Sequence, residues 1–159
     1  MDFKNVIYAF ACLSFAVVIG AAVYEHVAVA PRWSAAPPAS LSMFQGKYGL
    51  NPTPFWKAIH PVTLLLLIAS IILFWNTGSR PYLLITSAGY ALVLIITFAF
   101  FVPELIAITS QAFSENADPS LTKRAGLWVT LSLVRLAFLI VLAITAFLGL
   151  AKSGIQSSN

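Results

Sequence analysis

The stretch that decides the fold is Tyr24-Glu25-His26-Val27-Ala28-Val29-Ala30-Pro31, which ends a nearly unbroken apolar run that begins at Val6. A helical run of about 20 apolar residues is long enough to cross the hydrocarbon core of a bilayer. Ionisable side chains are rare within such helices, because placing them in lipid is costly, and they usually face the interior of a bundle or a watery cavity. The neighbouring Glu25 and His26 therefore predict a polar site near the end of a membrane span.

Three more apolar runs follow the first, so the chain contains four predicted spans. We place them at about residues 5–30, 54–75, 82–109 and 121–150. Hydrophobic residues make up 60% of the 159-residue chain and charged residues only 9%, a composition that excludes an ordinary soluble domain. None of the runs alternates polar with apolar residues, as spanning strands would. The sequence predicts an all-helical integral membrane protein, built as a single domain in which four transmembrane helices form an antiparallel bundle.

The connection between the first and second spans is the longest in the chain. Its middle, residues 39–45, is too apolar for a free linker, and long loops in compact domains are commonly lids or packed caps. We predict a short amphipathic helix from Ser40 to Tyr48 that lies over the mouth of the bundle. The connection at residues 76–81 is a tight turn, which is typical of antiparallel neighbours.

In an antiparallel bundle, the end of the first span, the start of the second, the end of the third and the start of the fourth meet at one membrane face. The ionisable side chains that we place inside the bundle all fall in these half-helices: Glu25, His26, His60, Glu104 and Arg135. At 1.5 Å per residue, Glu104 lies about 15 Å in from Ser114. Arg135 lies about 16 Å in from Arg124. Because the two depths match, we predict that Arg135 pairs with Glu104 or hydrogen-bonds around it.

Two kinds of chemistry suit these residue types. Imidazoles and carboxylates together form a ligand set for a transition metal, and the metal ligands would then be His26, His60, Glu25 and Glu104. The same groups can act as acid and base on an apolar substrate that enters from the lipid. In that case the catalytic residues are Glu104, Arg135 and His60, with Arg135 orienting Glu104 or an anionic group of the substrate.

Simpler interpretations stay open. Each histidine lies near a helix end, where it can be an interfacial polar residue, and Glu104 with Arg135 can be a purely structural ion pair. A small proton-coupled carrier would use Glu104 as its titrating group and Arg135 as the counter-ion. A structural or partner-binding bundle would need neither a titrating group nor a counter-ion. The charges gather at one membrane face, which favours a dead-end cavity over a pathway across the membrane.

The basic residues report on topology. They give a formal charge of +4 but form no basic stripe, which excludes a nucleic-acid partner. The partners we expect are membrane lipid and an apolar small molecule, and association into a homo-oligomer stays open. The first and third connections and the span starts after them hold more Lys and Arg than the opposite side. By the positive-inside rule the site faces the cytoplasm, and the expected location is a bacterial inner membrane.

Several segments resemble one known family. In the first half they are Gly20–Tyr24, Val27–Pro31, Pro37-Pro38 and Met43–Gln45. In the second half they are Phe101–Leu105, with a proline late in the third span, and Trp128–Arg135, which has the form Trp-x-x-x-polar-x-x-Arg. These segments are similar to the four-span anthrone-oxygenase-like membrane family, much of which is of unknown function.

This resemblance implies a membrane-embedded oxidoreductase whose substrate is a polycyclic anthrone-type phenol, oxidised by oxygen to a quinone. Members of the family usually carry Asn near the position of Glu104. They often carry Asn-His directly before the arginine, where this chain has Leu133-Val134.

Overall fold

The computed structural model describes the backbone of residues 2–156 and the side chains of residues 2–154. Its helical elements are α1 (Phe3–Tyr24), the π-helical turn η1 (Glu25–Val29), α2 (Ala30–Trp33), the 3-10 helix η2 (Ala39–Phe44), α3 (Thr53–Leu73), α4 (Arg80–Ile96), the π-helical turn η3 (Thr97–Phe101), α5 (Val102–Thr109) and α6 (Pro119–Gln156). No strand occurs in this part of the chain. The predicted all-helical fold is confirmed, with four helices that are long and apolar enough to cross a membrane: residues 3–33, 53–73, 80–109 and 119–154.

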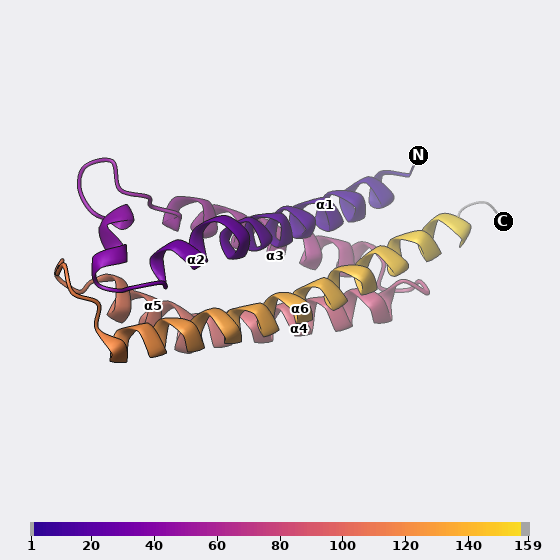
Figure 1. Ribbon diagram of the computed structural model, residues 1–159. Helices are drawn as coiled ribbons and strands as arrows, with labels where there is room; N and C mark the ends of the chain where they lie inside the picture. The colour runs from indigo at the N-terminus through magenta and orange to yellow at the C-terminus, as the bar shows by residue number, and fades with distance from the viewer. Residues whose placement is uncertain (1, 157–159) are drawn as a thin grey trace.

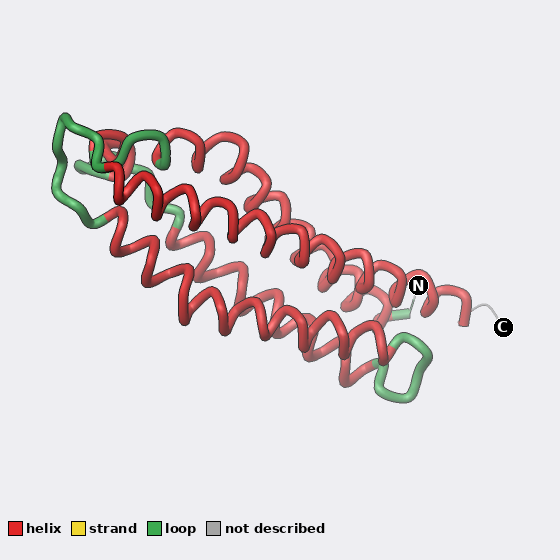
Figure 2. Tube along the Cα trace, turned by 60° about the horizontal axis from the view of Figure 1, so that its bottom comes forward, coloured by secondary structure: helices red, strands yellow, loops and turns green. Residues whose placement is uncertain are grey.

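The four long helices lie side by side in an elongated bundle (Figures 1 and 2). Both termini and the turn between α3 and α4 lie at one end, which we call the terminal end. The connections at residues 34–52 and 110–118 lie at the other, which we call the loop end (Figure 1). Many large apolar side chains remain exposed on the outer faces of the helices, as expected of surfaces that meet lipid.

The terminal end of the bundle is tightly packed. The buried hydroxyl of Tyr8 donates a hydrogen bond to the carbonyl oxygen of Ala146 at 2.9 Å, and Ser79 donates to the carbonyl of Gly149 at 2.8 Å. A Cβ atom added to Gly149 would collide with the Tyr8 hydroxyl and with the side chain of Tyr82. Close packing of this kind leaves little room for a ligand between the ends of α1 and α6.

The long connection at residues 34–52 is packed but is not the predicted helix from Ser40 to Tyr48. The 3-10 helix η2 ends at Phe44, because Gln45 is extended and Gly46 adopts a positive φ of 77°, a conformation that glycine takes without steric cost. Leu41 is completely buried, and the ring centroids of Trp33 and Phe44 lie 6.4 Å apart. The connection is therefore held against the helices over its first half.

The start of α6 is fixed by Asp118. Its Oδ1 atom accepts hydrogen bonds from the backbone N–H groups of Ser120 at 2.7 Å and Leu121 at 3.3 Å, which satisfies two donors of the first helical turn. Hydrogen bonds from Ser120 hold the pKa of the Asp118 carboxyl below its usual value. The backbone N–H of Asp118 also donates to the carbonyl of Pro37 at 2.8 Å. The two loop-end connections are thus joined directly.

Candidate functional site

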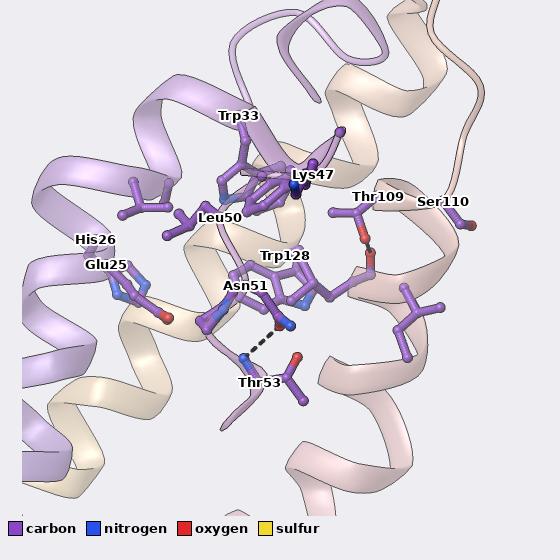
Figure 3. Close-up of a pocket in the computed structure, with 18 residues that line it drawn as sticks. Glu25, His26, Trp33, Lys47, Leu50, Asn51, Thr53, Thr109, Ser110 and Trp128 are labelled. Atoms are coloured by element: carbon purple, nitrogen blue, oxygen red, sulfur yellow. Dashed lines mark hydrogen bonds between the residues drawn. The ribbon is translucent and has the colours of Figure 1, made fainter. Parts of the chain in front are cut away.

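Two adjoining cavities lie in the loop-end half of the bundle. The inner cavity, of about 390 Å³, lies between the spans and is lined mainly by apolar side chains. The second, of about 550 Å³, is lined in part by residues of the segment 44–53 and is more polar; we call it the vestibule (Figure 3). Glu25 and His26 line both cavities, as do Leu105 and Trp128. The two spaces therefore share a wall, and Glu25 and His26 stand in it.

Both π-helical turns border the inner cavity. η1 contributes Glu25 and His26, and η3 contributes Thr97, Phe98 and Phe101. π-helical turns inside α-helices are rare and frequently occur at functional sites. They widen the helix at the two places where polar side chains turn toward the cavity.

A proline follows each π-helical turn by two residues. These are Pro31, after η1, and Pro103, after η3. A proline inside a helix removes one N–H, and its ring clashes with the carbonyl four residues earlier. Here those carbonyls belong to Val27 and Ala99, which lie inside the π-helical turns. The wider turn accommodates the clash, so an internal proline is a local cause of the π geometry.

Arg135 reaches the inner cavity from α6 with only neutral hydrogen-bond partners. Its Nη1 donates to Oγ1 of Thr97 at 3.0 Å, and its Nη2 donates to Oγ of Ser132 at 2.8 Å. The guanidinium carbon stands 4.1 Å from the centroid of the Phe101 ring. Within residues 2–154, no carboxylate oxygen lies within 4.0 Å of this guanidinium.

The predicted pairing of Arg135 with Glu104 is wrong. Both oxygens of Glu104 bind Arg124 instead, with N–O distances of 2.8 and 2.9 Å, and Glu104 lines neither cavity. Helix α5 ends at Thr109, so Glu104 is only about 7.5 Å from the helix end. Helix α6 already begins at Pro119, which puts Arg135 about 24 Å in. The two depths do not match.

Glu25 lines the same inner cavity as Arg135. Its Oε1 accepts a hydrogen bond of 2.9 Å from the indole N–H of Trp56 on α3, and its Oε2 receives none from the described side chains. The carboxylate is close enough to Arg135 for an electrostatic interaction, but it is beyond ion-pair distance. The two charged groups therefore line the same cavity without forming an ion pair.

His60 forms a second polar group on the α3 side. Its Nδ1 lies 2.7 Å from the hydroxyl oxygen of Tyr90, which is completely buried. The imidazole stacks on the indole of Trp56, with ring centroids 5.2 Å apart and planes 19° from parallel. Trp56 therefore links Glu25 to the imidazole, and Tyr90 extends this cluster to α4.

The orientation of His26 fixes its tautomer. Nδ1 lies 2.8 Å from the carbonyl oxygen of Ala22; because a carbonyl can only accept, Nδ1 carries the hydrogen. In the neutral ring, Nε2 is then an acceptor. This atom is enclosed and has no hydrogen-bond partner among the described residues.

The donor groups do not assemble as a metal site. Among residues 2–154, no three His, Cys, Asp or Glu side chains lie close enough together to hold a metal ion. Of the four expected ligands, Glu104 is bound to Arg124, and Glu25 is bound to Trp56.

Four of the five predicted site residues line the inner cavity: Glu25, His26, His60 and Arg135. Sequence reasoning missed Trp56, Tyr90 and Thr97, which position three of them. Tyr90 and Thr97 are seven residues apart on α4 and η3, so they share one helix face. That spacing of two polar residues in an apolar span was the available signal.

Comparisons with protein-family models, with curated proteins and with solved structures find no match for this chain. The resemblance to anthrone-oxygenase-like proteins thus stays a prediction, and the function has to be inferred from the inner cavity itself.

Proposed function

We propose that this chain is a small membrane-embedded oxidoreductase that binds an apolar, ring-shaped substrate through an acidic or carbonyl oxygen at Arg135. The observation that carries the proposal is the Arg135 guanidinium, which lines a largely apolar cavity and is bound only by the hydroxyls of Thr97 and Ser132. The two hydroxyls are neutral, and no carboxylate oxygen lies within 4.0 Å of the guanidinium among the described residues, so its charge is offset only at longer range by Glu25. A cation inside a membrane protein normally has a counter-charge or lines a functional cavity.

An apolar setting strengthens the attraction between this cation and an oxygen of the substrate, because the local dielectric constant is low. The cavity volume of about 390 Å³ lies within the range of pockets that hold small organic molecules. Phe101 and Trp128 line the same space and supply aromatic surface to a ring system.

Proton transfer belongs to the opposite wall. His60, hydrogen-bonded to Tyr90, and Glu25, held by Trp56, are the groups that can accept a proton from a substrate bound at Arg135. In the oxygenase reaction that the resemblance implies, a ring CH₂ group loses a proton to such a base. Molecular oxygen then oxidises the resulting anion, so that the CH₂ group and O₂ become a carbonyl and water.

In the membrane, we place the four helices antiparallel, with residues 34–52 as a cap over the cavities and the loop end toward the cytoplasm. This arrangement opens both cavities at one face. It suits an enzyme better than a carrier, because the packing around Tyr8 and Gly149 blocks the terminal end. The carrier alternative relied on a pair between Glu104 and Arg135, whereas Glu104 binds Arg124.

The test is the binding of 2-naphthoate, an apolar ring acid, to the protein in lipid nanodiscs. Energy transfer from tryptophan to naphthalene reports binding, and empty nanodiscs correct for partitioning. Arg135→Gln should weaken binding about 10-fold or more, since a hydrogen bond to a charged group is worth about 1.5–3 kcal/mol. Arg124→Gln, which changes an arginine outside the cavity, should leave the affinity unchanged.

Two further measurements sharpen the result. The uncharged analogue 2-methylnaphthalene should bind wild-type protein and Arg135→Gln equally, and a chelator should not alter 2-naphthoate binding. Equal 2-naphthoate affinity in wild type and Arg135→Gln would refute the anchoring role of Arg135.

A further inference from the structure

One seam of the bundle is loosely packed beside the inner cavity. Helix α3 packs along α1 and against α4, but it makes little contact with η3 and α5, which continue the third span toward the loop end. We infer that an anionic phospholipid binds at this seam, with one acyl chain inside the inner cavity and its phosphate group at Lys57. The inference goes beyond the proposed function, because it does not require Arg135 to anchor a ring-shaped substrate.

Side chains on both sides of the seam border the cavity and the outer surface at once. On the third span these are Phe98 and Ile106, which line the inner cavity although 63% and 59% of their surface is exposed. On α3 it is Lys57, which is also exposed. Residues placed in this way form the rim of an opening. Because both helices are long and apolar enough to span a membrane, the opening faces lipid.

The other seams around the cavity are closed. Helix α1 packs extensively on both α3 and α6, and α4 packs extensively on α6. Toward the loop end, the first span and α6 are joined by Trp33 and Trp128, two buried residues whose ring centroids lie 5.6 Å apart. The seam between α3 and the η3–α5 segment is therefore the side from which a lipid chain can reach the cavity.

The interior of the cavity suits a hydrocarbon chain. Its lining includes four apolar side chains contributed by α1, α4 and α6: Val18, Val93, Leu136 and Leu139. The guanidinium of Arg135 is already bound by two hydroxyls and stands against the ring of Phe101. A hydrocarbon chain that passes this group leaves both hydrogen bonds intact, and it brings no polar atom that would need a partner of its own.

The position of Lys57 along α3 places its ammonium group near the lipid phosphates. The 21 residues of α3 extend over about 31 Å, close to the thickness of a hydrocarbon core of about 30 Å. Helix α3 therefore begins near the headgroup boundary, and Lys57 lies about 6 Å inside it. From this depth a lysine side chain can extend its ammonium group back to the headgroups while its methylene groups stay in the apolar layer.

The charge of Lys57 is available to a lipid. Among residues 2–154, no carboxylate oxygen lies within 4.0 Å of its ammonium group; Glu25 lines the same cavity but is bound to Trp56. Lys47, which lines the neighbouring vestibule, adds a second positive charge in the loop-end half. An acyl chain gains little by leaving lipid for an apolar cavity, so the choice between lipids depends on the headgroup. One basic side chain near the surface favours an anionic lipid about 5-fold.

The experiment uses a phosphatidylglycerol that carries a photoreactive diazirine midway along one acyl chain, as a minor component of phosphatidylcholine nanodiscs. Mass spectrometry locates the labelled residues after irradiation. Val18 and Leu139 are buried between the helices and line the cavity, so they should be labelled only by a chain that has entered it. Their labelling should be about 5-fold stronger than with the matching phosphatidylcholine probe. Val141, which is exposed on α6, serves as a reference for lipid outside the bundle.

Two pairs of measurements test the headgroup and the route. Lys57→Gln should remove the preference for phosphatidylglycerol at the two buried residues. Lys123→Gln, which changes an exposed lysine that lines neither cavity, should keep it. Val102→Trp, which adds bulk at the seam, should reduce labelling of the buried residues by both probes. Labelling of Val141 should stay the same in every variant, because it requires only that the protein is folded in the bilayer.

Each part of the inference can fail separately. Wild-type labelling that is confined to exposed residues would refute an acyl chain in the cavity. Equal labelling of the buried residues by both probes, or a preference that survives Lys57→Gln, would refute the role of Lys57. Unchanged labelling in Val102→Trp would refute entry between α3 and α5. None of these results depends on 2-naphthoate, so the proposed function can fail while this inference holds, and the reverse.

Discussion

The indole nitrogen of Trp56 donates a hydrogen bond to Oε1 of Glu25 at 2.9 Å and so joins α3 to the π-helical turn of the first span. It is a contact between two side chains 31 residues apart in sequence. Because the same indole stacks on His60, one side chain orients a carboxylate and an imidazole together.

Replacing Trp56 with Phe tests this contact. The ring would be kept in part, but the N–H would be lost and Oε1 of Glu25 left without a partner. We expect the free energy of unfolding to fall by about 1.5–3 kcal/mol, the range for hydrogen bonds to charged groups. Unfolding in a denaturing detergent measures the change. The control is Trp75→Phe, at a tryptophan that is 47% exposed; an equal loss there would contradict the role of the hydrogen bond.

Replacing Arg135 with Met should separate stability from binding. The guanidinium has no carboxylate partner within 4.0 Å among the described residues, so its removal breaks no ion pair, and Glu25 loses only a more distant positive charge. We expect the free energy of unfolding to stay level or to rise by up to about 4 kcal/mol, while 2-naphthoate binding is lost. Such exchanges of stability for function are common at active sites. A clear loss of stability would mean that Arg135 is a structural residue.

The polar half of the bundle and its four spans could be predicted from the sequence, because apolar run length and the cost of charge in lipid act locally along the chain. The partner of Arg135 could not, since it depends on where two helices end. The predicted depths were counted from Ser114 and Arg124, whereas α5 ends at Thr109 and α6 begins at Pro119, which brings Glu104 to the level of Arg124 and leaves Arg135 deeper in the bundle.

The π-helical turns could have been suspected from Pro31 and Pro103, but a proline alone does not determine whether a π-helical turn forms. Pro61 lies inside α3, which stays α-helical throughout. The difference has to come from packing around the two turns, and η3 is held in place when the indole N–H of Trp128 bonds the carbonyl of Phe101 at 2.9 Å. Contacts between distant segments of this kind are invisible in a single sequence.

Replacing Gly149 with Ala should destabilise the terminal end. The added methyl group would collide with the hydroxyl of Tyr8 and come within 2.6 Å of Cβ of Tyr82. Overpacking a tight contact costs about 1–3 kcal/mol. The matched control on the same helix is Gly126→Ala, where no atom lies within 4 Å of the added Cβ and better helix propensity adds up to about 1 kcal/mol. Thermal unfolding of both variants in nanodiscs tests the contrast, and equal melting temperatures would contradict it.

Asp118 should make stability depend on pH. Hydrogen bonds from Ser120 lower the pKa of its carboxyl in the folded state, so the carboxylate stabilises the fold fully above the unfolded pKa of about 3.9. This contribution is lost as the pH falls through the lower folded pKa. The melting temperature of Asp118→Ala should therefore lie below that of wild type at pH 7, with the difference shrinking below about pH 4.

Asp118→Asn serves as the comparison, because its amide oxygen can still accept hydrogen bonds at the start of α6 but does not titrate. The difference in melting temperature between Asp118→Asn and Asp118→Ala should not vary with pH. A gap between wild type and Asp118→Ala that persists unchanged into acid would show that the carboxylate has no special role.

The packing of Tyr8 against Ala146 and Gly149 has a kinetic consequence. It closes the terminal end of the bundle, so that in the proposed enzyme the product has to leave from the loop-end half, where its precursor entered. Substrate and product of the proposed enzyme then use the same route, and product that accumulates in the membrane should slow turnover by competitive inhibition. Such an enzyme would work fastest beside a second protein that clears its product from the bilayer.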